Sequence, residues 1–237
     1  MHRKGAQDQK RARIFARIAR EIMVAAKSGV DPSSNPRLRS ALASARVANM
    51  PRDNIERAIK KATGEGADTQ FFEIRYEGYG PSGTAVIVEV LTDNKNRTAS
   101  EIRSFFTKFG GALGETGSVS FMFNHIGMLR FPKTIEFDAL FEEAVNCGAD
   151  NVEEQDDAFI ITCSFDQYAA VRDALIEKFQ DPLEASVVWD PVNSTALDEE
   201  NAQKFLKFID VVENNDDVQN VFSNAEISDS ILEKIHG

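Results

Sequence analysis

Apolar and polar positions repeat with a helical period over the first quarter of the chain. Between about Ala6 and Lys27, apolar side chains recur on one arc, and most basic side chains fall on the opposite arc. The residues DPSSNP (31–36) predict a turn, and a second helix is expected from about Pro36 to Ala48. Pro51 suits the first turn of a third helix, which ends before TGEGADT (63–69). The pattern predicts a three-helix bundle with basic outer faces.

The middle of the chain changes to short apolar runs that are typical of strands, separated by glycine-rich segments. Thr98 and Glu101 stand in capping-box register and predict the start of a helix. The expected elements are strands at FFEIRYE (71–77) and TAVIVEVLT (84–92), a helix from about Ala99 to Phe109, a glycine loop (110–118) and a strand at VSFMF (119–123).

From Ile126 onward the pattern predicts the order β-α-β-β-α-β, which is the ferredoxin-like arrangement. The tail, 198–237, is acidic and has a helical pattern, and it is long enough to pack back on the middle of the chain. The predicted fold class is α+β, with an N-terminal three-helix bundle and two α+β domains. The predicted domains are 1–68, the discontinuous pair 69–125 plus 193–237, and the ferredoxin-like 126–192.

Charge is distributed very unevenly along the 237 residues, which carry a formal net charge of −11. Residues 1–63 hold 15 Lys and Arg against five Asp and Glu, whereas the remaining residues hold 12 against 33. Such a basic module is typical of a surface that binds a polyanion backbone. Two other interpretations stay open: a solvated basic face, and an arginine-rich transit peptide, against which Asp8, Glu21 and the scarcity of serine argue.

No apolar run approaches the roughly 20 residues that a membrane helix needs, so we expect no membrane partner. Arg13, Arg17 and Arg20 interrupt every candidate for the apolar core of a secretory signal. Cys147 and Cys163 lie in apolar contexts without metal-like spacing, which favours buried thiols in a reducing compartment.

Candidate catalytic chemistry is sparse. GYGPSG (78–83) matches GxGxxG, but a strand follows it instead of a helix, so it predicts a hairpin and not a dinucleotide site. The loop 110–118 also leads into a strand; it is a tight loop or a partner contact. No histidine has a nucleophile or metal-ligand partner at a telling spacing, and the acidic runs EEQDD and ENNDD lack EF-hand spacing. We expect no enzyme activity, no cofactor and no metal.

The candidate nucleic-acid-binding residues lie on the three predicted helices and at the turn between the second and third. Pro51 disfavours α geometry at Met50, and we expect this turn either to tuck Met50 against Leu42 or to project Asn49 and Met50 as a probing tip. The candidates are Arg3, Lys4, Lys10, Arg13, Arg17, Arg20, Arg37, Arg39, Arg46, Asn49, Met50, Arg52, Arg57, Lys60 and Lys61.

Several long motifs, in order, resemble the YebC/PmpR family. They are HRKGAQDQKRARIFARIAREI, NPRLRSALASARVANMPRDNIERAIKKATG, YEGYGPSGTAVIVEVLTDNKNRTASEIR, GGALGETGSVSFMF and DDVQNVFSNAE, so the resemblance covers essentially the whole chain. In one departure, the family begins with a short leader before HRKG, whereas here Met1 precedes His2 directly. Contacts made by that leader lie outside this sequence.

The resemblance implies three domains, with the C-terminal segment rejoining the middle one, and non-enzymatic action on nucleic acid in the cytoplasm. It implies a probable transcriptional regulator that binds DNA. The alternative is a translation factor that binds rRNA or the ribosome and assists synthesis of proline-rich stretches; mitochondrial relatives activate translation of cytochrome c oxidase. A basic helical bundle suits either backbone, and no helix carries Asn, Gln and Arg at base-reading spacing, which slightly favours backbone or shape recognition. We expect a monomer rather than a stable oligomer.

Overall fold

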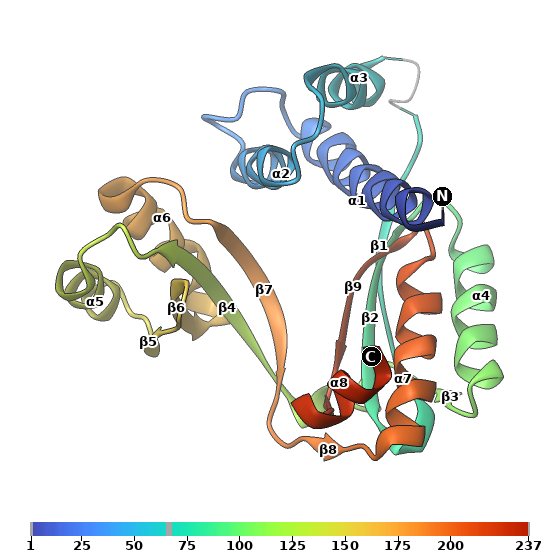
Figure 1. Cartoon of the computed structure of the whole chain (residues 1–237). Helices are drawn as coiled ribbons and strands as arrows, with labels where there is room; N and C mark the ends of the chain where they lie inside the picture. Colours follow the sequence, from blue (N-terminus) through green and yellow to red (C-terminus); the bar gives the residue numbers. More distant parts are fainter. Residues whose placement is uncertain (1, 65–67, 237) are drawn as a thin grey trace. The chain divides into compact units, whose positions relative to one another are not determined.

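The computed structural model describes residues 2–64 and 68–236, with the side chains of 2–10 and 236 left aside, and its chain divides into two compact units (Figure 1). The first unit comprises 1–123 and 191–237, and the second comprises 124–190. The helices are α1 (His2–Ala26), α2 (Pro36–Val47), α3 (Arg52–Thr63), α4 (Lys95–Lys108), α5 (Phe137–Asn146), α6 (Tyr168–Phe179), α7 (Glu199–Glu213) and α8 (Asp229–His236). The strands are β1 (Phe72–Tyr79), β2 (Ala85–Thr92), β3 (Ala112–Leu113), β4 (Phe123–Pro132), β5 (Asn151–Glu154), β6 (Ala158–Ser164), β7 (Glu184–Pro191), β8 (Thr195–Ala196), β9 (Val218–Ser223) and β10 (Ala225–Glu226). Short 3₁₀ turns lie at η1 (Pro81–Gly83), η2 (Ser120–Met122) and η3 (Phe165–Gln167).

The α+β fold class predicted from the sequence is confirmed. The predicted three-domain partition stays a prediction beside the two compact units.

Helices α1, α2 and α3 share one apolar core. Asn35 fixes the start of α2, because its Oδ1 accepts the N–H of Leu38 at 3.0 Å. The amide nitrogen of Asn35 donates to the carbonyls of Ala25 and Gly29 at 2.8 and 2.7 Å, which ties α2 to the end of α1. The core side chains are Ile22, Met23, Ala25, Ala26, Leu38, Ala41, Ala45, Met50, Ala58 and Ala62. The predicted bundle is therefore present, and its inward faces are those that the period indicated, except that Ile14 on the apolar arc of α1 is 39 % exposed.

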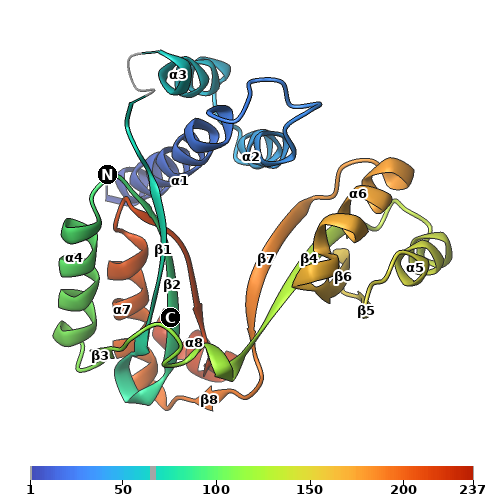
Figure 2. The ribbon, with the colours of Figure 1, turned by 180° about the vertical axis from the view of Figure 1, so that it is seen from behind.

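The rest of the first unit is a four-stranded sheet in the order β3-β1-β2-β9, with α4 and α7 side by side on one face (Figures 1 and 2). Strands β1 and β2 form the predicted antiparallel hairpin around η1. Strand β9 pairs antiparallel with β2, so the C-terminal tail completes the sheet. The tail was expected to be helical, and this expectation is wrong for β9. Pairing with β2, more than 100 residues earlier, determines its conformation.

The second unit runs β4-α5-β5-β6-α6-β7, and its sheet has the order β5-β6-β4-β7 (Figure 1). This is the predicted ferredoxin-like arrangement. Helices α5 and α6 pack their apolar sides on the sheet, where Leu140, Phe131 and Leu175 are fully buried. Cys163 lies in this core, Cys147 is half-buried, and both thiols are free.

Two predicted boundaries differ from the structure. Helix α4 begins at Lys95, one turn before the predicted start, because Asn94 caps it by accepting the N–H of Arg97 at 3.1 Å. Thr98, the predicted cap, is instead buried inside the helix. The run VSFMF forms the turn η2, and only its last residue, Phe123, enters a strand.

The glycine loop 110–118 is tight because it passes against β1. A Cβ on Gly111 would lie 2.3 Å from the carbonyl oxygen of Tyr79, so only glycine fits there. The buried carboxylate of Glu77 accepts the N–H groups of Val119 and Ser120 at 3.1 and 2.9 Å. Burial alone would raise the pKa of Glu77, but backbone N–H donors from this loop outweigh it and lower the pKa. A partner contact by this loop stays a prediction.

Candidate nucleic-acid interface

Three of the predicted arginines on α1 are held by the chain itself. Arg13 Nη1 donates to Asn214 Oδ1, and Arg17 Nη2 donates to the carbonyl of Glu213. Arg13 and Arg17 are half-buried, and burial lowers the pKa of Arg17 although Glu213 opposes the effect. The expectation of an exposed face is therefore wrong for this part of α1.

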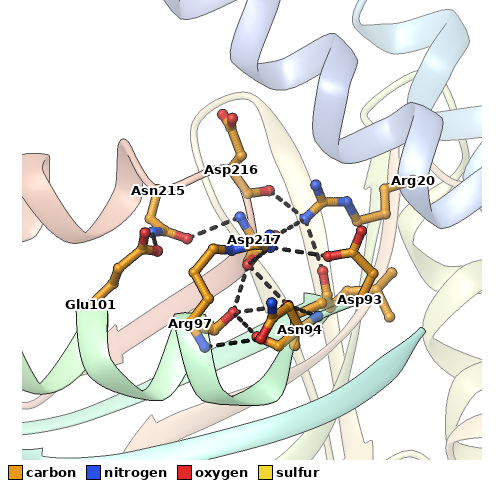
Figure 3. A network of polar contacts seen from close by, with 11 residues as sticks. Arg20, Asp93, Asn94, Arg97, Glu101, Asn215, Asp216 and Asp217 are labelled. Atoms are coloured by element: carbon orange, nitrogen blue, oxygen red, sulfur yellow. Dashed lines mark hydrogen bonds and ion pairs between the residues drawn. The ribbon is translucent and has the colours of Figure 1, made fainter. Parts of the chain in front are cut away.

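Arg20 makes the deepest of these contacts. Its Nη1 lies 2.6 Å from Asp217 Oδ1, 2.8 Å from the carbonyl of Asp216 and 2.9 Å from the carbonyl of Leu91 (Figure 3). Two of these oxygens come from the α7–β9 turn, about 200 residues away in sequence, and the third comes from β2, so no local pattern on α1 could reveal the contact. We call residues 213–217 the acceptor turn.

Asp217 is the centre of this network, with a side chain that is only 3 % exposed (Figure 3). Its Oδ2 accepts hydrogen bonds from Thr98 Oγ1 at 2.6 Å, Arg97 Nη2 at 2.7 Å and Thr92 Oγ1 at 3.0 Å. Burial alone would raise the pKa of Asp217, but the hydrogen bonds from Arg97, Thr98 and Thr92 and the charge of Arg20 lower it. The network joins α1, β2, α4 and the acceptor turn before β9, and its polar groups satisfy one another. Its role is structural.

The predicted cations of α2 have mixed surroundings. Arg37 forms ion pairs with Glu21 at 2.6 Å and Glu73 at 2.5 Å, and these carboxylates raise its pKa, mainly because Arg37 donates hydrogen bonds to Glu21. Arg39 donates to the carbonyl of Pro32 at 3.3 Å and is half-buried. Arg46, near the end of α2, is exposed. The cations of α2 therefore do not form one uniformly exposed basic face.

The turn between α2 and α3 does not project Met50. Met50 is 7 % exposed and belongs to the bundle core, and its N–H donates to the carbonyl of Ala45 at 2.9 Å. The probing-tip expectation is therefore wrong for Met50, because a left-handed Asn49 (φ 53°) turns the chain back toward the bundle. Asn49 itself is exposed, and Val47 is 67 % exposed.

Among the side chains that the structure describes, those of helix α3 form the most open basic face of the bundle. Arg57, Lys60 and Lys61 are exposed, and among the described residues none of them has an ion pair. Arg52 is also exposed and pairs with Glu56 at 2.7 Å along the same helix. We call Arg57, Lys60 and Lys61 the α3 basic face; it projects from a helix whose inward side is anchored by Ala58 and Ala62.

The first turns of α1 include the backbone of Arg3, Lys4 and Lys10, whose side chains lie outside the described part of the chain. Arg11, which does not follow the basic arc of α1, is exposed, and its Nη2 lies 3.5 Å from the carbonyl oxygen of Asn49. Its guanidinium also stacks 5.2 Å from the ring centroid of Phe15, one turn along the helix. The i,i+4 spacing of Arg11 and Phe15 could predict this stacking, whereas the approach of Arg11 to the α2–α3 turn depends on the tertiary structure.

The geometry defines a two-unit α+β protein whose helical module presents cations to solvent on α3 and at the end of α2. In residues 2–64 and 68–236 no helix combines the length and apolar character needed to cross a membrane. Residues 1–65 match the family model described as "TACO1/YebC protein N-terminal domain". Residues 71–225 match the model Transcrip_reg, described as "TACO1/YebC second and third domain".

The chain belongs to the TACO1/YebC family. It is also similar to a solved structure, a conserved hypothetical protein, Aq1575, from Aquifex aeolicus, with 42% sequence identity and a TM-score of 0.79. That match covers 94% of this chain and 93% of the other. Family membership supports a regulatory, nucleic-acid-binding protein.

Proposed function

We propose that this protein is a non-enzymatic regulator that binds the sugar–phosphate backbone of a nucleic acid on the outer faces of α2 and α3. The observation that carries the proposal is the α3 basic face, where Arg57, Lys60 and Lys61 are exposed without ion pairs to described residues. The α1 arginines, by contrast, already have acceptors from the same chain. Exposed cations of this kind contact phosphates, and each one that does so releases counterions.

The composition of α3 favours backbone contacts over base reading. Its first turn carries Asp53, and Glu56 follows one turn later, so the start of the helix repels phosphates and offers few donors to base edges. Asn54 is half-buried. The cations gather toward the C-terminal half of the helix, which suits contacts that fix register and orientation.

For the biological process, we propose regulation of transcription through binding to duplex DNA, in line with the Transcrip_reg family model. A second candidate is binding to rRNA or the ribosome as a translation factor that assists synthesis of proline-rich stretches. One observation favours this candidate: residues 124–190 hold 15 Asp and Glu against four Lys and Arg. So acidic a unit is repelled along a long duplex, whereas a large particle can accept the protein in one orientation.

The test removes the α3 basic face without disturbing the bundle. Arg57→Gln, Lys60→Gln and Lys61→Gln are combined, and binding to a fluorescent 30-base-pair DNA duplex and to an rRNA hairpin is measured across salt concentrations. The slope of log K against log salt is expected to become shallower by about three, with at least a tenfold (~10×) loss of affinity near 0.1 M salt. Because the side chains are exposed, the melting temperature should hardly change.

The matched control removes the same charge elsewhere, with Lys133→Gln, Arg172→Gln and Lys178→Gln in the second unit. This control should keep the slope of the parent. Equal losses in both triple variants would show that net charge alone drives binding and would contradict the proposal. Co-sedimentation with ribosomes, compared with retention of promoter duplexes, separates the two processes, because the α3 variant should lose whichever interaction is physiological.

A further inference from the structure

Helix α4 presents an outer face made of hydrogen-bond donors. The polar residues of this outer face recur at helical spacing, and all of them are exposed to solvent. We define the α4 outer face as Asn96, Ser100, Arg103, Ser104, Thr107 and Lys108. The opposite side of the helix buries Thr98, Ile102 and Phe106 against the sheet, so the outer face is held on a rigid element.

No acidic side chain belongs to this face. The helix contains one acid, Glu101, which is half-buried and turned toward the acceptor turn, where its Oε2 accepts from Asn215 Nδ2 at 2.7 Å. Asp93, which precedes α4, pairs with Arg97 at 3.0 Å. The outer face therefore combines hydroxyl, amide and cationic groups without a carboxylate to repel an anion.

This composition contrasts with the surrounding region. Outside residues 1–63, the first unit holds eight Lys and Arg against 18 Asp and Glu, and four of those eight cations lie on α4. Two of the four, Arg103 and Lys108, belong to the outer face. A solvated surface on an acidic body would be expected to mix both signs of charge, so the exclusion of acids from this face needs a separate reason.

Arg97 and Arg103 show that the cations of α4 have two different roles. Arg97 is fixed by Asp217 at 2.7 Å and by Asp93, inside the structural network of Figure 3. Arg103, nearly two turns further, has no ion pair among the described residues. It lines a shallow hollow of about 430 Å³ together with Ser100, Ser104, Thr107 and Lys108. Arg103 thus stands at a concave, donor-lined position with its charge available.

We infer that the α4 outer face is a second surface for the phosphate backbone of the bound nucleic acid. The inference rests on the proposed function and extends it from the helical module to the sheet region of the first unit. Arg, Lys, Ser, Thr and Asn side chains are the groups that donate to phosphate oxygens in protein–nucleic acid complexes. The face has these groups and lacks acceptors with negative charge.

The experiment uses the full chain and the same duplex and hairpin probes as above. Arg103→Gln combined with Lys108→Gln should make the salt slope shallower by about two and weaken binding several-fold (roughly 3–10×), with an unchanged melting temperature. Ser104→Glu, which adds an acid to the face, should weaken binding without removing any cation. The matched control is Lys133→Gln with Lys178→Gln, which removes the same charge from the second unit and should keep the parent slope.

The outcomes separate this inference from the proposed function. If Arg103→Gln with Lys108→Gln and Ser104→Glu bind like the control while the α3 variant loses affinity, the α4 inference is wrong and the proposed function stands. If the parent protein binds neither probe, the proposed function fails, and this inference fails with it.

Discussion

The bundle carries two arginine- and lysine-rich faces that look alike in sequence and differ in the folded chain. On α1, Arg13, Arg17 and Arg20 contact the acceptor turn, and Arg20 joins the buried Asp217 at 2.6 Å. On α3, the basic face has no such partner among the described residues. The comparison shows that a cationic helix face can be an internal docking surface. Residues from the other end of the chain decide whether such a face forms an internal contact or stays open to solvent.

The largest expected effect comes from a substitution at the centre of the contact between α1 and the acceptor turn. Asp217→Asn removes the charge that faces Arg20 and Arg97 in a site that is only 3 % exposed. Loss of one partner of a buried pair typically costs about 3–5 kcal/mol of stability. Urea denaturation followed by circular dichroism measures this loss, and the affinity of the folded fraction for nucleic acid should stay that of the parent.

The neighbouring Asp216 provides the control, because its backbone carbonyl, and not its carboxylate, accepts from Arg20. Asp216→Asn should change stability by no more than about 0.5 kcal/mol. Equal destabilisation by the two variants would show that Arg20 senses only the general acidity of the turn.

A second substitution tests the turn between α2 and α3, which leads into the helix with the basic face. Met50→Ala should cost about 2–4 kcal/mol, because it removes a buried side chain from the bundle core. Nucleic-acid affinity of the folded protein should not change. The matched variant Val47→Ala alters a side chain that is 67 % exposed and should cost little. If Met50→Ala lost binding without losing stability, the result would support the hypothesis that the turn projects Met50 as a probing tip.

Low pH should weaken the contact between α1 and Asp217 and leave the α3 basic face unchanged. The pKa of Asp217 and that of Glu77 are lowered in the folded protein, from ordinary values of 3.8 and 4.5. Groups with a depressed folded pKa stabilise the protein above the unfolded pKa, and this stability is lost as pH falls through the folded pKa. Stability should therefore be flat near neutrality and fall below about pH 4.5, by at most about 1.4 kcal/mol per pH unit for each group.

Melting temperatures between pH 7 and pH 2.5 measure this dependence. In a plot of melting temperature against pH, Asp217→Asn should remove the part of the acid-dependent slope that belongs to Asp217 and leave the part that belongs to Glu77. An Asp217→Asn protein with the full slope of the parent would show that other carboxylates carry the acid sensitivity.

The smallest expected effect comes from the outer part of the α1 contact. Arg13→Gln with Arg17→Gln removes the hydrogen bonds of two half-buried residues to positions 214 and 213, so stability should fall by about 1 kcal/mol or less. The salt slope for nucleic acid should match the parent, unlike that of the α3 variant. A slope shallower by about two would mean that the acceptor turn releases these arginines to phosphates, as the sequence alone predicted.

Local patterns in the sequence determined much of this fold. Helical periodicity gave the three helices of the bundle and their buried faces, because the inward side chains must recur every three or four residues whatever they pack against. Alternation and glycine-rich turns gave the β1–β2 hairpin and the ferredoxin-like unit. The separation of a basic module from an acidic body also follows directly from the order of residues.

Only the tertiary structure decided which polar faces meet. Strand β9 lies in a tail with a helical pattern and becomes a strand because β2 offers it an edge. Thr98 matched a capping pattern, but Asn94 caps the helix and Thr98 donates to Asp217 instead. Periodicity determines that a side chain points away from its own core, yet the partner that it meets there comes from a segment about 200 residues distant. For Arg20 that partner is a buried carboxylate; for the α3 basic face the folded chain supplies no described acid, so its charge remains directed to solvent.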